Sequence, residues 1–253
     1  MGVKFAQHQF GFYEVNNLSK TNFMKFSTVC HNLSAKLVLL GAAFVFLGAA
    51  VPLATAQTNG SAKPPTSLMP EAEKLLSNLG YWIIKVDGKK DASTAHAITA
   101  FQKVEGRKRT GVLTQKELSA MRLASRPAAK RAGAAHVEVD NARQVLFLVD
   151  ENGNVTRILP VSTGTGKKYF SQGKQQTANT PRGDYKITRQ IAGVRHAPLG
   201  DLYYPNYFLG GWAIHGSTSI PFLPASHGCV RIPNFAAEEF SRLVSVGMDV
   251  FVY

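Results

Sequence analysis

The residues best suited to chemistry surround the second cysteine of the chain. Residues 213–217 read Ala-Ile-His-Gly-Ser, and residues 225–231 read Ala-Ser-His-Gly-Cys-Val-Arg. A nucleophilic thiol needs a base that takes its proton, and it needs donors aimed at the oxyanion that forms on the attacked carbonyl. His215 ends an apolar run and can serve as the base, while Gly228 lets neighbouring backbone amides approach a carbonyl oxygen. The pattern therefore predicts acyl transfer through Cys229.

The same side chains leave a metal site as an alternative. His215, His227 and Cys229 could hold zinc with one open position. No Asp or Glu lies close in sequence to act as a base or a fourth ligand, and Arg231 would place positive charge beside the ion. The thiol interpretation expects neither a metal nor a cofactor. Three further histidines lack such neighbours and are interpreted as surface or hydrogen-bonded residues: His96, His136 and His196.

The segment that must position these residues has the period of a β protein. Val137 and Val139 alternate with polar residues, and two apolar runs at 145–149 and 155–161 flank Asn152-Gly153, a typical hairpin turn. Further elements are expected as strands at 185–191, 212–215 and 249–253 and as a helix at 235–246. We therefore expect a mostly β catalytic domain.

A compact helical unit precedes this domain. Pro70 suits a first helical position, and an apolar stripe at helical spacing leads to Gly80 as the stop. Ser93 or Thr94 can cap a second helix, and Thr-Gln-Lys-Glu at 114–117 is a capping box ahead of a third. The expected fold class is thus mainly β, with a small N-terminal module of three helices.

Composition shifts divide the chain into five segments. Residues 1–56 form a targeting segment, and residues 69–124 and 135–253 form the helical and β domains. Residues 57–68 and 125–134 are rich in small residues, Pro or basic residues and are interpreted as linkers.

The targeting segment resembles a secretory signal in its physical pattern. An uncharged apolar run at 37–53 follows Lys25 and Lys36, and Ala-Thr-Ala at 54–56 has the small-x-small form of a cleavage site. This pattern predicts export. A retained membrane anchor stays open as the alternative, because 17 apolar residues lie at the lower limit for spanning a bilayer. Translation from Met24 is a further hypothesis.

The composition excludes several classes of protein. Of 253 residues, 45% are hydrophobic, which excludes a disordered chain, and the two cysteines exclude a disulfide scaffold. The formal net charge is +13, and residues 57–253 keep 25 cations against 15 anions. No nucleic-acid-binding motif accompanies this charge, so we expect no nucleic-acid partner. An acidic polymer or a cell surface suits the charge better.

The helical unit resembles the peptidoglycan-binding domain-1 family over residues 70–123. The resemblance rests on Leu-Gly-Tyr at 79–81, on Val-Asp-Gly at 86–88 and on Ala-Ile and Phe-Gln within 97–102. The unit departs from the family pattern at residues 91–92, where a glycine is common. The resemblance implies that the unit binds peptidoglycan, through its stem peptides or its glycan. A helical spacer that binds nothing is the alternative.

Residues 135–253 resemble the L,D-transpeptidase catalytic domain. The resemblance rests on His-Gly at 215–216, on the spacing of 14 residues from this histidine to the cysteine, and on Ser-His-Gly-Cys-Val-Arg at 226–231. Thr-Pro-Arg-Gly-Asp-Tyr at 180–185 is similar to an upstream element of the family. The family implies a β-sandwich-like catalytic fold that acts on the peptide stems of bacterial peptidoglycan.

The resemblance also implies a role for each matching residue. Cys229 corresponds to the nucleophile and His215 to the base. Four neighbours are implied to support this pair or the oxyanion: Ser226, His227, Gly228 and Gly216. The candidates for substrate binding are Arg231, Trp212 and Tyr204. Arg231 can instead pair with a structural acid, and the two aromatic residues can instead belong to the core.

The family reaction begins with attack of the Cys229 thiolate on a tetrapeptide stem, which releases D-alanine and leaves a thioester. An amine of a second stem then forms a 3→3 cross-link, whereas water as the acceptor would make the enzyme a carboxypeptidase. Carbapenem-type β-lactams are implied as inhibitors that acylate Cys229. Two other classes stay open: a wall-binding protein without catalysis and a cysteine hydrolase of ordinary L,L peptides.

Overall fold

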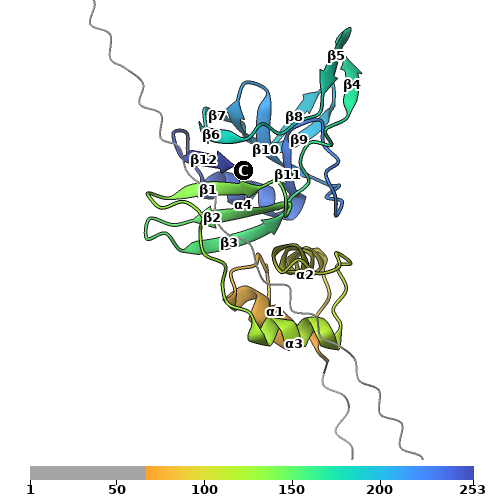
Figure 1. Ribbon diagram of the computed structural model, residues 1–253, viewed down its shortest axis with the longest axis vertical. Helices are drawn as coiled ribbons and strands as arrows, with labels where there is room; N and C mark the ends of the chain where they lie inside the picture. The colour runs from red at the N-terminus through yellow and green to blue at the C-terminus, as the bar shows by residue number, and fades with distance from the viewer. Residues whose placement is uncertain (1–66) are drawn as a thin grey trace, which may run out of the picture. The chain divides into compact units, whose positions relative to one another are not determined.

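The computed structural model describes residues 67–253 (Figure 1). The predicted signal segment, its cleavage site and most of the first linker lie outside the described residues. Within residues 67–253, no helix combines the length and the apolar character needed to cross a bilayer.

Three helices form the N-terminal part, as expected. Their bounds are Met69–Asn78 for α1, Ala92–Val104 for α2 and Gln115–Leu123 for α3. Thr114 caps α3 by accepting a hydrogen bond from the Glu117 amide. The cap of α2 is Asp91 rather than Ser93 or Thr94, because the extended backbone of Asp91 lets its carboxylate accept from the Thr94 amide at 2.8 Å. We call α1 to α3 the helical module.

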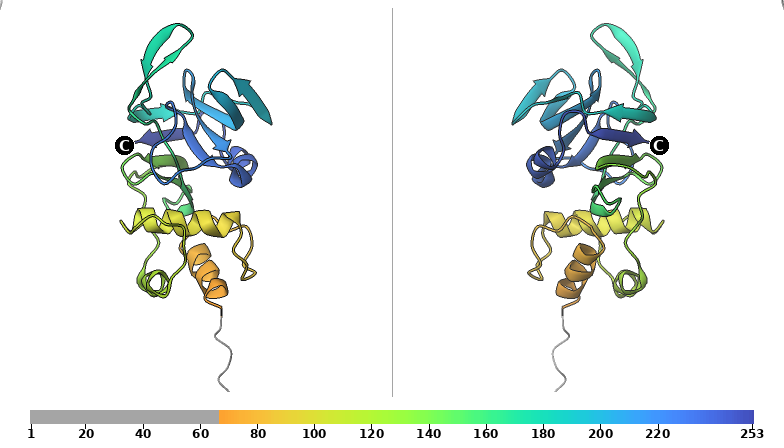
Figure 2. Two further views of the ribbon diagram at one scale, coloured as in Figure 1. Left: turned by 90° about the vertical axis from the view of Figure 1, so that its right-hand side faces the viewer. Right: turned by 90° about the vertical axis from the view of Figure 1, so that its left-hand side faces the viewer.

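The remaining chain folds into two sheets, one hairpin and one helix (Figures 1 and 2). The first sheet has the order β3-β2-β1-β12-β6, and the second has the order β11-β10-β9-β7 with β8 paired to β9. The first sheet contains β1 His136–Asp140, β2 Val145–Val149, β3 Val155–Pro160, β6 Gly183–Lys186 and β12 Asp249–Val252. The second contains β7 Arg189–Gln190, β8 Val194–Ala197, β9 Gly200–Leu209, β10 Trp212–Ser217 and β11 Val230–Pro233. The hairpin is β4 Lys168–Ser171 with β5 Lys174–Thr177, and the helix is α4 Asn234–Leu243. A mainly β fold with a three-helix module is thus confirmed.

Strand β2 is buried on both faces, which explains its unbroken apolar run. Leu146 and Leu148 belong to the core cluster that includes both sheets and α4. Val145, Phe147 and Val149 belong to a second cluster, which the helical module completes on the other face. A strand covered on only one side would show alternating polar residues instead. The unbroken apolar run of β2 is therefore explained by the helices that pack against this face of the sheet.

The run expected as one strand at 185–191 is two strands in different sheets. Strand β6 ends at Lys186 beside β12, whereas β7 begins at Arg189 beside β9. Between them the Ile187 amide donates to Met248 and the Thr188 amide to Tyr207. The alternation continues because Ile187 stays in the core at the point where the chain passes from one sheet to the other.

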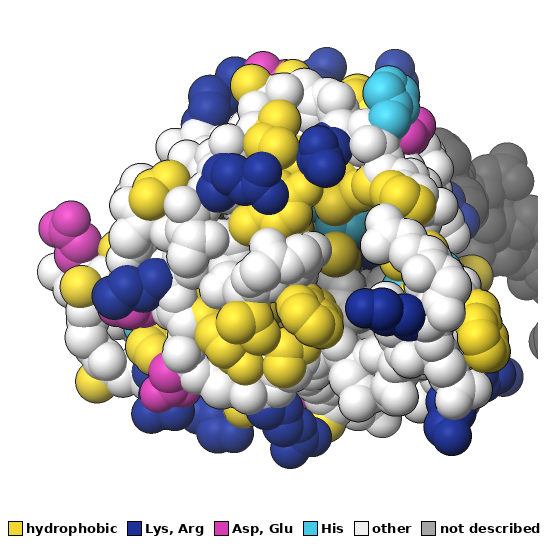
Figure 3. Space-filling view, turned by 90° about the horizontal axis from the view of Figure 1, so that it is seen from above, with side chains coloured by type: hydrophobic (Ala, Val, Ile, Leu, Met, Phe, Trp, Pro, Cys, Tyr) yellow, Lys and Arg dark blue, Asp and Glu magenta, His cyan; other side chains and the backbone are white. Residues whose placement is uncertain are grey.

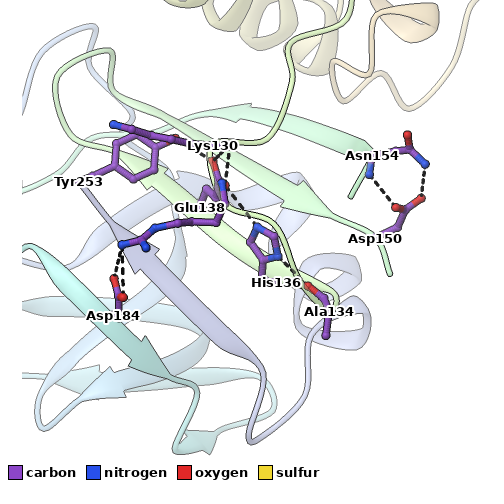
Figure 4. Close-up of polar contacts among 9 residues, drawn as sticks. Lys130, Ala134, His136, Glu138, Asp150, Asn154, Asp184 and Tyr253 are labelled. Atoms are coloured by element: carbon purple, nitrogen blue, oxygen red, sulfur yellow. Dashed lines mark hydrogen bonds and ion pairs between the residues drawn. The ribbon is translucent and has the colours of Figure 1, made fainter. Parts of the chain in front are cut away.

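The segment expected as the second linker is held on the catalytic domain by a buried carboxylate (Figure 4). Glu138 in β1 is fully buried and accepts from the Lys130 amide at 2.8 Å, the Arg131 amide at 2.6 Å and the Tyr253 hydroxyl at 2.8 Å. Nε2 of His136 lies 3.3 Å from the same carboxylate. Burial opposes ionisation of Glu138, but these hydrogen bonds outweigh it and hold its pKa below the usual range. The segment is therefore an ordered connection.

We expect Glu138→Gln to lower the free energy of unfolding by about 1–3 kcal/mol at pH 7, because buried amides lose a charged acceptor. The depressed pKa adds a pH dependence. The unfolded carboxyl takes up its proton at a higher pH than the folded one, so this contribution disappears as the pH falls through the folded pKa. Denaturant unfolding between pH 7 and pH 3 measures both effects.

The matched control is Asp184→Asn, which removes the exposed carboxylate that binds Arg131 at 2.9 Å. An exposed ion pair contributes little, so this variant should stay within about 0.5 kcal/mol of the wild type. Equal effects of the two substitutions would contradict the role given to Glu138.

Candidate active site

Parallel pairing of two neighbouring strands brings the predicted nucleophile and base together. Ile214 in β10 pairs with Val230 in β11, so Cys229, just before β11, lies beside the strand that carries His215. Both side chains line a cleft of about 520 Å³. His215 is 6% exposed, whereas Cys229 is half-buried, so the thiol is the more accessible of the two groups.

His215 is held as a neutral base. Its Nδ1 lies 2.8 Å from the carbonyl oxygen of Gly216, which can only accept, so Nδ1 carries the proton and Nε2 is left as an acceptor. Burial lowers the pKa of His215 to about 4; the bond to Gly216 opposes this shift, and the positive charge of Arg231 adds to it. The imidazole is therefore unprotonated near neutral pH and ready to take a proton.

The thiol of Cys229 is also neutral in the resting site. Burial raises its pKa, which the Ala213 amide and the charge of Arg231 partly offset. The thiol donates to the carbonyl oxygen of Gly211 across 3.7 Å. These shifts favour an uncharged thiol and an uncharged imidazole over a preformed thiolate–imidazolium ion pair.

Ser226 braces the loop that carries the thiol. Its Oγ donates to the carbonyl oxygen of Cys229 at 2.6 Å and accepts from the Gly228 amide at 3.0 Å. Thr180 adds a second support, because its hydroxyl donates to the carbonyl oxygen of Gly228 and accepts from the Gly164 amide at 2.9 Å. The Gly228 amide is thus engaged inside the loop. The amides of its two neighbours are left as the candidates for an oxyanion.

Two glycines permit the close packing around the pair. A Cβ on Gly228, whose φ is +140°, would lie 2.6 Å from Nε1 of Trp212 and 2.8 Å from the Asn179 carbonyl oxygen. A Cβ on Gly216 would lie 2.5 Å from Cβ of Ala237 in α4. Side chains at either position would push the catalytic loop or the base away from their neighbours. These glycines therefore support the site through their missing side chains.

The remaining predicted residues are divided between the cleft and the core. Trp212, His227 and Arg231 line the cleft, and Nε1 of Trp212 donates to Asn179 at 2.8 Å. Tyr204 packs against the core, which is the alternative that the sequence left open for it, and Tyr203 packs there too but also lines the cleft. The left-handed backbone of Tyr204, with φ +48°, interrupts the regular alternation of β9.

The hairpin β4–β5 supplies cleft residues that the sequence did not predict. Tyr169 and Gln176 line the cleft, and the Tyr169 ring lies 4.7 Å from the His227 ring. The hydroxyl of Tyr169 donates to Gln176 across the hairpin at 2.8 Å. Strand β5 is polar and exposed, and the two adjacent aromatic residues of β4 make no alternating pattern, so no hydrophobic period marked the hairpin. Figure 3 views the molecule from the side of this hairpin and shows apolar side chains around a hollow, with many Lys and Arg and few acids.

The other histidines have separate surroundings. His136 contacts Ala134 and Glu138, His196 pairs with Asp201 at 2.7 Å, and His96 stacks near Phe235 with ring centroids 5.8 Å apart. In residues 67–253, no group of three His, Cys, Asp or Glu residues is arranged to hold a metal ion.

Comparison with known proteins agrees with this geometry. Residues 134–252 match the family of L,D-transpeptidase catalytic domains, and residues 67–121 match a family of peptidoglycan binding domains. The chain is 39% identical to an L,D-transpeptidase from Xylanimonas cellulosilytica, with a TM-score of 0.70 over 73% of this chain and 92% of that one. An L,D-transpeptidase from Stackebrandtia nassauensis is 23% identical, with a TM-score of 0.45 over 73% and 90% of the two chains. None of the curated proteins matches.

The low pKa of His215 predicts an acid-sensitive fold. Unfolded histidine takes up a proton near pH 6.5, but the folded residue does so only near pH 4. The unfolded state therefore binds more protons between these values, and stability falls as the pH drops from 6.5 to 4. We expect a loss of about 2 kcal/mol between pH 7 and pH 4.5, measured by denaturant unfolding.

His215→Gln should remove most of this loss, because no titrating group remains at the position. His196→Gln is the control, because it removes an exposed imidazole and leaves His215 in place. Identical pH dependence in His215→Gln and the wild type would refute the assignment.

Proposed function

Because the chain belongs to the L,D-transpeptidase family, we propose that it joins the peptide stems of peptidoglycan through a thioester on Cys229. The observation that supports the proposal is that His215, in β10, and Cys229, directly before the parallel strand β11, line one cleft. The acyl donor is a tetrapeptide stem that ends in D-alanine.

Acylation starts with transfer of the thiol proton from Cys229 to Nε2 of His215. The sulfur attacks the carbonyl carbon before the terminal D-alanine, and a tetrahedral oxyanion forms. The amides of His227 and Cys229 are the proposed donors to this oxygen. As the carbon–nitrogen bond breaks, His215 returns its proton to the leaving amine, so D-alanine departs and the thioester remains.

The second half of the reaction reverses the roles of the same two groups. The side-chain amine of a neighbouring stem attacks the thioester, and His215 takes a proton from this amine. The sulfur leaves as the carbon–nitrogen bond of the 3→3 cross-link forms, and the proton returns to Cys229. Water in place of the amine would release a tripeptide stem, which makes the acceptor an outcome of the test below.

Arg231 is the proposed partner of a stem carboxylate. It lines the cleft and is half-buried, and in residues 67–253 no acidic side chain forms an ion pair with it. This arrangement favours the substrate role over the structural one. Its charge also lowers the pKa of the thiol, so it favours the nucleophilic form. Trp212 is proposed to contact the stem from the cleft wall, because 36% of its surface stays exposed there.

The location of the protein follows from the same proposal. The helical module matches a peptidoglycan binding family, and we propose that it holds the enzyme on the wall. The apolar run and small-residue site at residues 37–56 support export across the membrane. The net charge of +10 in residues 57–253 suits an anionic wall.

We expect Cys229→Ala to abolish D-alanine release from purified tetrapeptide muropeptides, while the wild-type chain yields D-alanine and a cross-linked dimer. Mass spectrometry of the products measures both. Binding to purified wall should persist in the variant, because the helical module is unchanged. D-alanine release without a dimer would favour the carboxypeptidase, and no release by a wild-type protein that binds would favour a non-catalytic wall protein.

A carbapenem should acylate Cys229 and increase the protein mass by one drug molecule. The acylation rate should rise from pH 6 to pH 9, because burial raises the pKa of the thiol and the fraction of reactive thiolate therefore increases throughout this range. Intact-protein mass spectrometry over time gives the rate, and Cys229→Ala serves as the unreactive control. An unmodified wild-type mass after long exposure would count against a reactive thiol.

A further inference from the structure

We propose that Lys103, in helix α2 of the helical module, is a positioning residue for the catalytic loop around Cys229. The helical module would then shape the active site in addition to any binding of the wall. This inference rests on the proposed role of Cys229, but its structural part can be measured without the reaction.

Lys103 crosses from the helical module into the catalytic domain. The side chain is 1% exposed, and its Nζ donates to the carbonyl oxygens of Val161 at 2.8 Å and of Gln144 at 3.1 Å. An ammonium group is costly to remove from water, and a neutral residue such as Met could fill the same apolar path. Compared with such a neutral residue, lysine adds the hydrogen bonds to these two carbonyl oxygens.

Val161 leads directly into the backbone that supports the catalytic loop. The next residue, Ser162, exchanges two main-chain hydrogen bonds with Arg231, each 3.1 Å long. The carbonyl oxygen of Thr163 accepts from the amides of Ala225 at 3.0 Å and Ser226 at 2.9 Å. The segment held by Lys103 therefore contacts the chain on both sides of Cys229.

Gln144 ties the second acceptor to the same segment. Its backbone is left-handed, with φ +62°, and its carbonyl oxygen accepts from both Lys103 and the Val161 amide. Its side chain donates to Oγ1 of Thr163 at 2.6 Å and accepts from the Thr163 amide at 2.9 Å. Lys103 thus connects the backbone at Gln144 with the backbone at Val161, and both segments contact Thr163. Two residues later, the Thr165 amide donates to the carbonyl oxygen of Ser226 in the loop that carries Cys229.

Arg109 of the helical module contacts the other side of the catalytic loop. Its guanidinium donates to the carbonyl oxygen of Phe222 at 2.9 Å, in the connection between β10 and β11. The carbonyl oxygen of the adjacent Leu223 accepts from Oγ of Ser162 at 2.9 Å. The connection is therefore held between the helical module and the segment that Lys103 supports.

Adhesion between the module and the sheet does not require Lys103. Phe101, Phe147 and Ile158 already bury apolar surface in the shared cluster. Burial, and then the nearby charge of Arg109, lower the pKa of Lys103 to about 7, so this position opposes the charged form of lysine. Lys103 differs from its apolar neighbours in its hydrogen bonds to the carbonyl oxygens of Gln144 and Val161.

The test compares Lys103→Met with the wild-type chain by hydrogen exchange and mass spectrometry. Met keeps the apolar stem and removes the ammonium, so we expect faster exchange of amides at 162–165 and 222–231 with little change in the core strands. Carbapenem acylation of Cys229 should slow about ten-fold, as expected for a displaced nucleophile, while wall binding stays unchanged.

Two variants in the same module are the controls. Lys74→Met removes an exposed lysine and should change neither measurement. Leu118→Ala removes a fully buried side chain of α3, so it destabilises the module without touching the Lys103 contacts. If loss of stability alone slowed acylation, Leu118→Ala would match Lys103→Met at equal unfolding free energy, and the proposal would be wrong.

Arg109→Ala provides a second variant if Lys103→Met unfolds. It should raise exchange at 219–226 and slow acylation by a smaller factor, whereas Arg109→Lys should restore part of the effect. Unchanged exchange in the catalytic loop of these variants would overturn the inference. Faster exchange with no acylation even in the wild type would uphold the coupling and count against the proposed chemistry of Cys229.

Discussion

The site depends on the parallel pairing of β10 with β11. Parallel neighbours cannot be joined by a tight turn, because the chain must return to the starting end of the sheet, which takes about a dozen residues. The 14-residue spacing between His215 and Cys229 is this return path. The loop that closes the crossover therefore also carries Cys229, the proposed nucleophile, and the parallel pairing of the strands requires a loop of about this length.

Burial of the pair sets how the site can react. A cleft that lowers the pKa of the base and raises that of the thiol keeps both groups uncharged until a substrate arrives. Such a thiol is less exposed to adventitious oxidation and alkylation than a standing thiolate. In the proposed reaction, charge develops on the way to the transition state, where the loop amides and Arg231 are the proposed groups that stabilise it. Removal of water raises the pKa of the thiol, and it also strengthens the electrostatic interaction of the loop amides and Arg231 with a developing negative charge.

The sequence predicted the parts of the site that lie close together along the chain. His215, Cys229 and their glycines follow from local residue types, and the hairpin at Asn152-Gly153 and the three helices follow from turn and capping signals. Residues that reach the cleft by tertiary folding were missed, above all Tyr169 on a polar hairpin. The choice between cleft and core for Tyr204 could not be made from the sequence, because its left-handed backbone interrupts the alternation of β9. Lys103 carried no local signal at all, since its acceptors lie 41 and 58 residues away.

Strand β2 belongs to two hydrophobic clusters, so the two family modules do not have separate interiors. Tethered modules in other proteins can be lost, exchanged or duplicated while each keeps its own core. A gene fragment that began near residue 134 would expose the face formed by Val145, Phe147 and Val149 to water. Such a product would be prone to aggregation through that face, however intact its catalytic residues. In evolutionary terms, the shared strand means that the catalytic domain and the helical module are expected to be inherited together.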